Sequence, residues 1–274
     1  MPEYPDIVNY VEAIGERALR SRLERIELLH PFLLRTVSPA PGEVEGRELT
    51  GVDRLGKRIV LGLSGEAYLL VHLMIAGRLH WQAGARRQRT AKPLARFQFT
   101  CGTLILTEAG SKRRASLHIV GSEEELGAFD RGGLDPTSAE LEAFADRLRS
   151  ENHTLKRALT DPRMVDGVGN AYSDEILFRA RLSPFDQTRS LSDEGYARLH
   201  AACREILLEW AERIRTERAG EFPREVTAFR DGMAVHGRYG KPCPDCGTEV
   251  QRIRYAENEC NYCPRCQVGG RVYA

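Results

Sequence analysis

The chain has 274 residues, of which 42% are hydrophobic and 29% are charged, and its formal net charge is +1. A chain of this length and composition can bury a sizeable core in one large domain or two ordinary ones, so it is predicted to be globular. No segment approaches the roughly 18 consecutive apolar residues of a membrane helix, and the acidic, interrupted N-terminus does not resemble a secretion signal. We therefore expect a cytoplasmic protein with no membrane partner.

Apolar residues recur at helical spacing from Ile7 to Leu19, which predicts a helix over residues 6–23. Residues 24–120 change period, because short segments rich in β-branched and aromatic residues alternate with Gly, Pro or charged turns. The first part of the chain is therefore expected to be an N-terminal helix followed by a mainly antiparallel β domain, either a sandwich or a flattened barrel.

The sequence Gly-Gly-Leu-Asp-Pro at 132–136 marks a change to helical patterns, and four segments within 137–220 predict a four-helix domain. Residues 222–239 are rich in Gly, Arg and small residues and are expected to form a linker with some strand character. The predicted class is α+β. The predicted domains are 1–132 for the β-sandwich, 133–222 for the helices, and 223–274 for the linker and a cysteine module.

Four of the seven cysteines form two C-P-x-C pairs separated by sixteen residues. Each pair turns two thiolates toward one point, as tetrahedral zinc requires. A closed shell of four thiolates leaves no coordination position for water, so we expect one structural zinc ion without a catalytic role, and no organic cofactor. The predicted ligands are Cys243, Cys246, Cys263 and Cys266.

The residues between the two pairs, 247–262, are expected to form a β-hairpin whose tip reaches a partner. Cys260 lies within this hairpin but has no second cysteine at knuckle spacing, so it is left out of the ligand set. Cys101 and Cys203 are assigned to a strand and a helix, where buried, inert thiols are expected.

Positive charge is concentrated in one stretch, since residues 85–115 contain eight Lys and Arg residues but the single acid Glu108. A local stretch of this kind can form a phosphate-binding face on a nearly neutral protein. A solvated loop is an equally good interpretation of the stretch alone.

Pro2 follows Met1, and a small second residue normally permits removal of the methionine, which exposes a secondary amine. An α-amino group has a pKa of roughly 7.7–8.0, so part of it is nucleophilic at neutral pH. Glu3 lies beside it, and an amine that attacks a sugar C1′ needs a nearby carboxyl group to protonate the departing ring. Most chains that begin Met-Pro use the proline for no chemistry, and this pattern alone leaves that interpretation open.

Four motifs occur in one order along essentially the whole chain: MPEYPDI at the start, LGKR around Lys57, DGVGN ending at Asn170, and CPRCQ ending at Gln267. Together they resemble the formamidopyrimidine-DNA glycosylase and endonuclease VIII family of helix-two-turn-helix DNA glycosylases. The resemblance implies a bifunctional enzyme that flips a damaged base out of DNA, excises it and cleaves the strand at the abasic site. Damaged DNA is thus the expected partner of a monomeric enzyme that associates with the nucleoid when it acts.

The resemblance also implies roles for three residues of the β domain. Pro2 would form a Schiff base with the deoxyribose, and Glu3 would act as the acid that assists opening of the sugar ring. Lys57 matches the family's β-domain lysine. The resemblance implies that Lys57 contacts a phosphate and assists the elimination. A lysine in L-G-K-R at the start of a strand is also compatible with a plain surface position.

Residues 165–170 match the family's helix-two-turn-helix loop. Gly167 and Gly169 permit a tight turn, and the helix that follows presents unpaired N–H groups to a phosphate. Asn170 would cap this helix and contact the DNA backbone near the lesion. A plain helix cap remains the alternative.

Base flipping leaves a gap in the duplex that the family fills with side chains from two β turns. Matching HLMIAGRL to the first turn places Ile75 at its tip, and matching SKRRASLH to the second places Arg113 and Arg114 there. The phenylalanine wedge that usually accompanies the arginine is absent. The missing wedge leaves the preference for the opposite base open.

The zinc hairpin departs from the family pattern in a second way, because Asn258 stands where an arginine usually holds the phosphates around the lesion. Asparagine brings no charge and cannot clamp a phosphate with two bonds. Arg252, Arg254 or Arg271 is a possible substitute. The sequence therefore predicts β-elimination more firmly than δ-elimination.

Two other functions stay open at this point. A DNA-damage-binding protein with the same fold but weakened chemistry would explain the missing arginine and phenylalanine, and a protein-interaction module would explain only the cysteines. The lesion is also open among ring-opened formamidopyrimidines, oxidised pyrimidines, and bulky or crosslinked lesions in single-stranded DNA.

Overall fold

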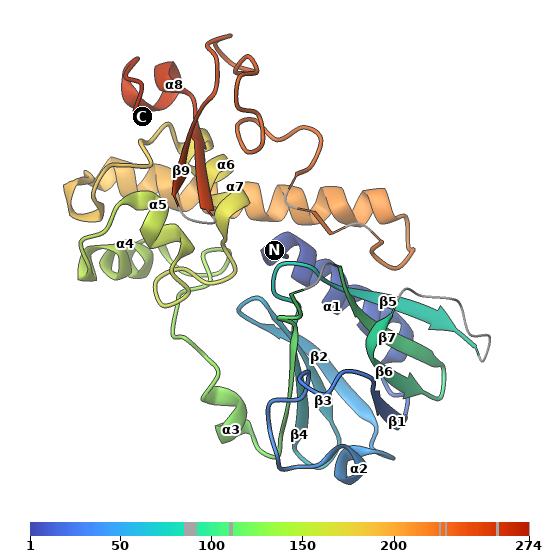
Figure 1. The fold of residues 1–274 in the computed structure, drawn as a ribbon. Coiled ribbons are helices and arrows are strands. Elements are labelled where there is room, and N and C mark those ends of the chain that lie inside the picture. Colours follow the sequence, from blue (N-terminus) through green and yellow to red (C-terminus); the bar gives the residue numbers. More distant parts are fainter. Residues whose placement is uncertain (85–91, 110–111, 225, 228, 256–257, 274) are drawn as a thin grey trace. The chain divides into compact units, whose positions relative to one another are not determined.

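A computed structural model describes residues 1–84, 92–109, 112–224, 226–227, 229–255 and 258–273 (Figure 1). Contacts within the chain divide it into two compact units. Unit 1 is Met1–Asp130 with Ala211–Val226, and unit 2 is Arg131–Trp210 with Thr227–Ala274. Each unit is described by itself. In the part of the chain that the structure describes, no helix is both long and apolar enough to span a membrane.

Unit 1 is an antiparallel β-sandwich preceded by a helix, as the sequence predicts. One sheet has the strand order β1-β6-β7-β5 and the other β2-β3-β4-β8. The strands are β1 (Leu23–Leu28), β2 (Leu49–Leu55), β3 (Arg58–Leu63), β4 (Ala67–His72), β5 (Gly77–Ala83), β6 (Pro93–Phe99), β7 (Gly102–Glu108) and β8 (Ser116–Val120). Two short helices, α2 (Pro41–Val44) and α3 (Glu123–Gly127), lie in its connections.

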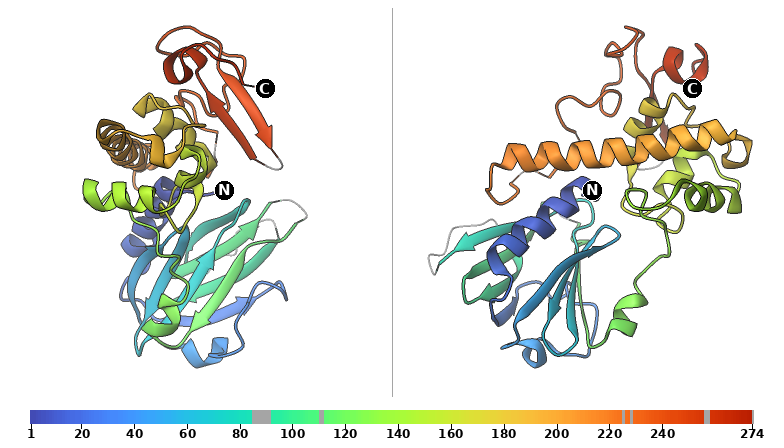
Figure 2. Two further views of the ribbon diagram at one scale, coloured as in Figure 1. Left: turned by 90° about the vertical axis from the view of Figure 1, so that its left-hand side faces the viewer. Right: turned by 180° about the vertical axis from the view of Figure 1, so that it is seen from behind.

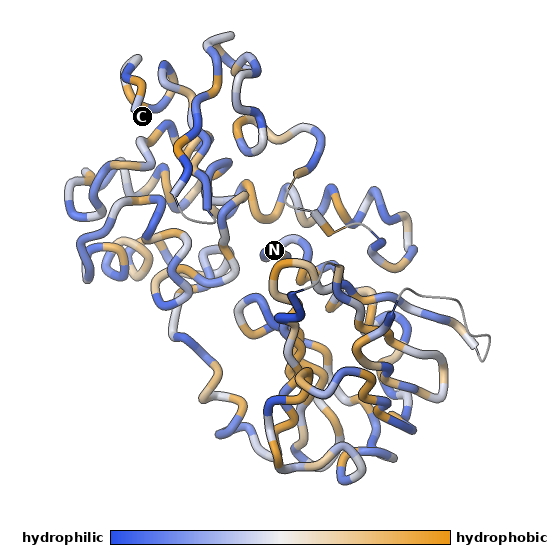
Figure 3. Tube along the Cα trace, in the orientation of Figure 1, coloured by the Kyte–Doolittle hydropathy of each residue, from blue (hydrophilic) through white to orange (hydrophobic). Residues whose placement is uncertain are grey.

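The core of unit 1 lies between the two sheets. Alternate residues point inward, so that Ile59, Leu61 and Leu63 of β3 are buried with Leu104 and Leu106 of β7. This period of two is what a sheet with one face on the core requires. Figure 3 shows hydrophobic segments recurring along these strands.

Two predictions for unit 1 are wrong in detail. Helix α1 spans Tyr4–Ala18 and does not continue to residue 23, because Arg20 adopts a left-handed φ of 65° and the chain then enters β1. Strand β2 shows little alternation in its sequence, since charged and glycine residues interrupt it. Cys101 lies exposed in the turn between β6 and β7, where it is neither in a strand nor buried.

Unit 2 contains the four predicted helices and the cysteine module. The helices are α4 (Leu141–Ser150), α5 (Leu155–Thr160), α6 (Asn170–Ala180) and α7 (Asp193–Arg218), with the 3-10 turn η1 (Thr188–Ser190) before α7. Figure 2 shows α7 as one uninterrupted helix, which passes from unit 2 into unit 1 after Trp210. Cys203 is buried on α7, as predicted.

The cysteine module forms a hairpin of β9 (Gln251–Tyr255) and β10 (Asn258–Tyr262), followed by the short helix α8 (Pro264–Val268). The hairpin between the cysteine pairs is therefore confirmed. The predicted strand character of residues 222–239 is wrong for the described part of that segment, which consists of turns and irregular backbone.

An ion-pair network joins α1 to the last part of α7, both in unit 1. Arg215 Nε donates to Glu12 Oε2 at 2.8 Å, and Arg218 Nη2 donates to Glu16 Oε1 at 2.7 Å. The hydrogen bond from Arg218 holds the pKa of Glu16 below its usual range. These pairs fix the helix whose first turn carries the N-terminus of the chain.

We expect Arg218→Met to lower the free energy of unfolding by about 1–2 kcal/mol, because it removes the largely buried partner of a half-exposed carboxylate. The lowered pKa of Glu16 means that its contribution is present above the ordinary glutamate range and is lost as the pH falls through the lowered value. Chemical denaturation at several pH values measures both effects. Arg204→Met, at an exposed position of the same helix, is the control, and an equal loss in that variant would contradict the network.

Candidate functional site

The N-terminus of the chain is enclosed at the start of α1. Met1 is 38% exposed, whereas Pro2 is buried and Glu3 is only 2% exposed. Glu3 stands just before the first turn of the helix, and its backbone N–H donates to Asp6 Oδ2 at 3.1 Å. The positive end of the helix dipole favours carboxylates at this position. The fold therefore holds a carboxyl group directly beside the terminal residues.

The terminal amine, which Met1 carries in this structure, has a perturbed pKa. Burial lowers the pKa of this amine below its usual range. The carboxylates of Glu3 and Asp6 oppose the shift, while the positive charges of Arg78 and Lys57 add to it. An amine with a lowered pKa is unprotonated and nucleophilic to a greater extent at neutral pH. Asp6 and Arg78 lie inside the quoted segments MPEYPDI and HLMIAGRL, but neither was singled out, because its proximity to the terminal amine depends on the fold.

Lys57 lies in the turn between β2 and β3, directly after Gly56, whose φ is +63°. Its side chain is half-buried and lies close enough to the terminal amine to affect the pKa of that amine. The structure therefore brings Pro2, Glu3 and Lys57 together in unit 1 from two separate parts of the sequence.

His72 is a polar residue of this region that no sequence pattern predicted. It ends β4 and pairs in register with Arg58 of β3. Burial, followed by the positive charges of Arg58 and Lys57, lowers the pKa of His72 to about 4. The imidazole is thus neutral at physiological pH and can both donate and accept a hydrogen bond. A single histidine at the end of the apolar segment AYLLV was the only signal in the sequence.

Ile75 lies in the turn between β4 and β5, where its side chain is 50% exposed. Met74 beside it adopts a φ of +53°. The Gly77 N–H donates to the Leu73 carbonyl at 2.9 Å, and a Cβ at Gly77 would lie 2.3 Å from that oxygen. Only glycine fits this close approach, so the backbone of the turn presents Ile75 to solvent in a defined position.

Arg113 and Arg114 differ in how they are held before β8. The guanidinium of half-buried Arg113 donates to the backbone carbonyl of Glu108, whereas the exposed Arg114 uses its backbone N–H to donate to the Glu108 carboxylate at 3.0 Å. Arg114 is therefore the one that presents its side chain to solvent.

The rest of the basic stretch is only partly described. Arg86, Arg87 and Arg89 lie outside the described residues. Arg96, on β6, pairs with Glu27 at 3.1 Å, which reduces the positive charge that this part of the sheet offers to a partner.

In unit 2, Asn170 is the first residue of α6 rather than its cap. The N-cap position belongs to Gly169, and Gly167 before it has a φ of +77°, which permits the tight turn. The predicted capping role of Asn170 is wrong because the chain enters helical geometry one residue earlier than a cap at position 170 requires. Its side chain is half-buried, and its backbone carbonyl accepts a bond from Lys156 Nζ at 2.7 Å.

A buried charged network lies beneath this loop. Lys156 Nζ donates to Asp174 Oδ1 at 2.6 Å, and Asp174 Oδ2 lies 2.8 Å from His236 Nδ1 and accepts from Asn261 Nδ2 at 3.0 Å. Burial alone would raise the pKa of Asp174, but attraction to Lys156 and the bond from His236 hold it below its usual range. The pKa of Lys156 is raised, because attraction to Asp174 outweighs the effect of burial.

Glu175 extends the network to the segment that leads into the cysteine module. Its carboxylate accepts the backbone N–H groups of Ala234, Val235 and His236 at 2.7, 2.9 and 2.9 Å. Burial raises the pKa of Glu175, although these hydrogen bonds oppose the shift. No pattern in the sequence indicated this network, because its members come from α5, α6, residues 234–236 and β10.

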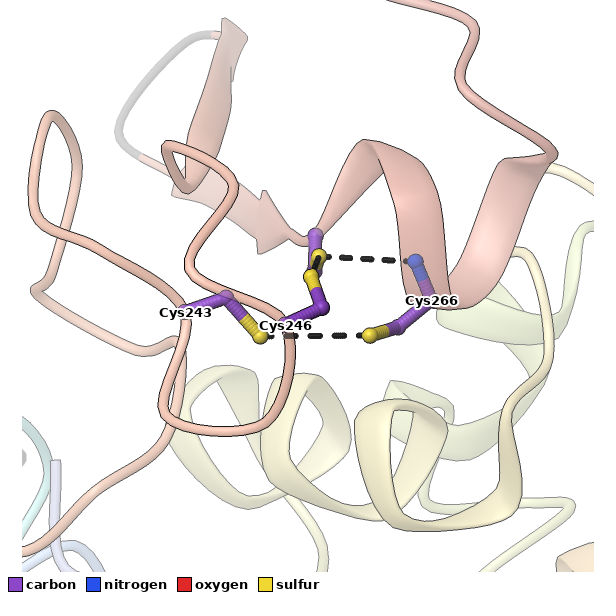
Figure 4. A group of neighbouring side chains, drawn as sticks. Cys243, Cys246 and Cys266 are labelled. Carbon is purple, nitrogen blue, oxygen red and sulfur yellow. Dashed lines mark hydrogen bonds between the residues drawn. The ribbon is translucent and has the colours of Figure 1, made fainter.

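Figure 4 shows the cysteine cluster, in which one sulfur atom from each of four residues lies within 4.8 Å of all the others. The Cys243 and Cys266 sulfurs are 3.9 Å apart, and those of Cys246 and Cys263 are 3.4 Å apart. Tetrahedral Zn–S bonds of about 2.3 Å would place sulfurs about 3.8 Å apart, so the four residues fit such an ion. Cys260 lies outside the cluster, as predicted.

The hairpin places its polar side chains on different faces. Asn258 is exposed and pairs in register with Tyr255, whereas Arg254 pairs with Glu259 on the next position. The side chain of Arg252 already has two partners within the chain, since its guanidinium lies 3.5 Å from Glu259 and over the ring of Tyr239.

Both Arg254 and Arg271 are exposed, so of the three arginines that could replace the missing one, these two are the more available to a partner. Arg254 shares its sheet face with Arg252 and not with Asn258.

Comparison with known proteins agrees with this arrangement. Residues 1–115 match the model of the formamidopyrimidine-DNA glycosylase N-terminal domain, and residues 133–218 match that of the formamidopyrimidine-DNA glycosylase H2TH domain. The chain is 34% identical to a formamidopyrimidine-DNA glycosylase of Thermus thermophilus, covering 98% of this chain and 100% of the relative. It is 32% identical to that of Moorella thermoacetica, covering 93% and 95%.

Solved structures show the same fold. The Lactococcus lactis FPG (MutM) in complex with FAPY-dG-containing DNA superposes with a TM-score of 0.86 at 24% identity, over 97% of this chain and 100% of that one. The LlFpg protein in complex with THF-DNA and an inhibitor superposes with a TM-score of 0.84 at 25% identity and the same coverage.

The buried pair of Lys156 and Asp174 should contribute to the free energy of unfolding. We expect Lys156→Met to lower the free energy of unfolding by about 3–5 kcal/mol, because it leaves the Asp174 carboxylate buried without its cationic partner. The double variant Lys156→Met/Asp174→Asn should recover part of this loss. Chemical denaturation of the full chain is the measurement, and a single variant as stable as the parent would contradict the argument.

The effect should also depend on pH. The lowered pKa of Asp174 makes the contribution of the pair present above the ordinary aspartate range and lost as the pH falls through the lowered value. The raised pKa of Lys156 keeps the contribution present below the ordinary lysine range and lost as the pH rises through the raised value. The difference between parent and variant should therefore be largest between these limits.

Proposed function

This chain belongs to the formamidopyrimidine-DNA glycosylase family, and from that membership we propose that it excises a damaged base and nicks the DNA at the resulting abasic site. The observation that carries the proposal is the start of the chain, where Pro2 is buried directly beside Glu3 and the amine that Met1 carries in this structure has a lowered pKa. A purely structural N-terminus gives no reason to bury an amine among two carboxylates and two cations.

In the proposed reaction, Met1 is removed and the nitrogen of Pro2 attacks C1′ of the damaged nucleotide. An N–C1′ bond forms while the bond from C1′ to the base breaks, and the base leaves with the electron pair and takes up a proton. Glu3 protonates the ring oxygen as the C1′–O4′ bond breaks, which gives a Schiff base. Loss of a C2′ proton then expels the 3′ phosphate, which is β-elimination.

DNA contacts are proposed for residues of both units. Lys57 and neutral His72 supply donors to phosphates beside the damaged nucleotide, and Ile75 and Arg114 enter the space that the flipped nucleotide leaves. Arg113 supports the second turn through its bond to the Glu108 carbonyl. In unit 2, the start of α6 at Asn170 offers backbone N–H groups to a phosphate.

The choice between eliminations follows from Asn258. An uncharged amide stabilises the second leaving phosphate less than an arginine does, so we propose that β-elimination dominates and δ-elimination is weak. The relatives are named for formamidopyrimidine, and this lesion class is our first choice of substrate. We also propose that the protein acts as a monomer in the cytoplasm, since one nucleotide is processed at one site.

We propose that the four clustered cysteines hold one structural zinc ion. Such an ion joins the two ends of the hairpin and leaves catalysis to the N-terminus. Zinc binds cysteines as thiolates, so each of the four thiols would lose its proton when the ion binds.

Borohydride trapping tests the nucleophile. We expect the untagged protein, incubated with DNA that contains an abasic site, to form a covalent adduct at Pro2 because reduction fixes the Schiff base. The trapping rate should rise with pH as the amine of Pro2 loses its proton, and it should level off once the amine is unprotonated. Peptide mapping locates the adduct.

The controls separate the two chemical roles. An N-terminal extension should abolish the adduct but not DNA binding, and Glu3→Gln should reduce base excision at least about 100-fold while a preformed abasic site still gives an adduct. Glu123→Gln, on the exposed helix α3, is the matched control. An adduct mapped to Lys57, or full activity of the extended chain, would overturn Pro2 as the nucleophile. Tight DNA binding without any adduct would favour the damage-binding alternative.

Metal analysis tests the cysteine cluster. We expect about one zinc per chain by mass spectrometry, and loss of that zinc in Cys246→Ser together with a lower unfolding temperature, because a module this small depends on its metal for folding. Cys260→Ser changes a hairpin cysteine outside the cluster and should keep the zinc. Full zinc content in Cys246→Ser would contradict the proposed ligand set.

A further inference from the structure

The aromatic ring of Phe229 in unit 2 is exposed and lies outside the four family motifs. Phe229 is 64% exposed, although large apolar side chains are normally buried. Its ring stacks on that of His236, with ring centroids 5.4 Å apart and an interplanar angle of 20°. His236 itself is 4% exposed. One side of the Phe229 ring is therefore backed by a buried ring, while much of its remaining surface faces solvent.

The pair is held rigidly by its surroundings. His236 Nδ1 lies 2.8 Å from Asp174 Oδ2, and the Phe229 N–H donates to Thr227 Oγ1 at 3.0 Å. Gly237 has a φ of +69°, and a Cβ there would lie 2.6 Å from the Phe229 ring, so the ring packs directly on the backbone. The ring therefore has close contacts on one side although most of its surface is exposed.

A polar cavity of about 170 Å³ adjoins the aromatic pair. Its lining includes Arg230, Arg238 and Lys241 against the single acid Asp231, so the formal charge of these side chains is positive. Arg238 Nη2 donates to the Pro242 carbonyl at 3.0 Å, which fixes its guanidinium near the cavity. The cavity is smaller than the roughly 300–1,000 Å³ of sites for whole small molecules, and it suits a single anionic group.

We propose that Phe229 is a stacking platform for an unpaired nucleobase of the bound DNA strand, and that the adjoining cations hold a phosphate of the same strand. Aromatic side chains beside a positively charged groove are how proteins bind unpaired nucleotides, because every base has a face that can stack. The buried network of Lys156, Asp174 and His236 acquires a role in this scheme, since it supports the back of the platform. The inference rests on the proposed function, because it assigns a further contact to the DNA that the enzyme binds.

Phe229→Leu tests the platform, because leucine keeps an apolar side chain but cannot stack. The probes are two duplexes, one with a formamidopyrimidine and one with a tetrahydrofuran abasic analogue, and the readout is the dissociation constant. We expect about 5- to 100-fold weaker binding of at least one duplex, with affinity retained in Phe229→Tyr and Phe229→Trp. Phe32→Leu, the same change at a residue of unit 1 that is 68% exposed, should bind like the parent.

The pattern across the two probes identifies the base. Weaker binding of the formamidopyrimidine duplex alone assigns the platform to the damaged base, and weaker binding of both assigns it to the base left unpaired opposite the lesion. Equal affinity of the parent and Phe229→Leu for both duplexes overturns the platform. Failure of the parent itself to bind either duplex counts against the proposed function instead.

A second variant tests the adjoining cations. Lys241→Ala should weaken binding of both duplexes and reduce the slope of log Kd against log salt by about one, as loss of one phosphate contact does. An unchanged slope would contradict the proposed contact between the cations of the cavity and a phosphate. Zinc content and unfolding temperature show whether each variant remains folded.

Discussion

Asp174 is a carboxylate with no exposed side-chain surface, and unit 2 is organised around it. A buried negative charge is tolerated only when cationic and hydrogen-bonding partners surround it. Here Lys156 neutralises the charge, while His236 and Asn261 bond the second oxygen. These partners come from α5, from the segment before the cysteine module and from β10. One charge therefore fixes the helix-two-turn-helix loop, the hairpin and the aromatic pair relative to one another within this unit.

Unit 1 solves a different problem, which is how to hold a reactive chain end in place. Helix α1 buries Pro2 and Glu3 at its first turn, and the pairs that Glu12 and Glu16 form with α7 fix its body. The lowered pKa of the terminal amine follows mainly from burial. The same packing that positions the amine thus also changes its protonation, so geometry and reactivity have a common cause.

Sequence patterns predicted those features that depend on residues close together in the chain. Spacing identified Cys243, Cys246, Cys263 and Cys266 as a cluster, period identified the helices and most strands, and the short MPEYPDI motif identified Glu3. The roles assigned to Pro2, Glu3 and Lys57 remain predictions, although the structure brings these residues together.

The sequence failed where distant segments decide the outcome. His72 gains its lowered pKa only from burial beside Arg58 and Lys57, and β2 is a strand because β3 pairs with it. The predicted start of α6 was wrong by one residue at Asn170, because sequence patterns do not define helix ends to a single residue. Hydrogen bonds of the Asp174 network connect residues as far apart in sequence as Asp174 and Asn261, which are 87 positions apart, and no local rule connects them.

The buried network around Asp174 limits which substitutions the chain can accept one at a time. A single substitution at Lys156, Asp174, His236 or Asn261 strands a buried charge or a buried hydrogen-bonding group, so each intermediate along a stepwise path is less stable than either end. The four positions are therefore expected to change as a set or to stay fixed, whereas an exposed position such as Arg254 is free to drift alone. Divergence within this half of the molecule should be uneven, slow around one carboxylate and fast on the hairpin surface.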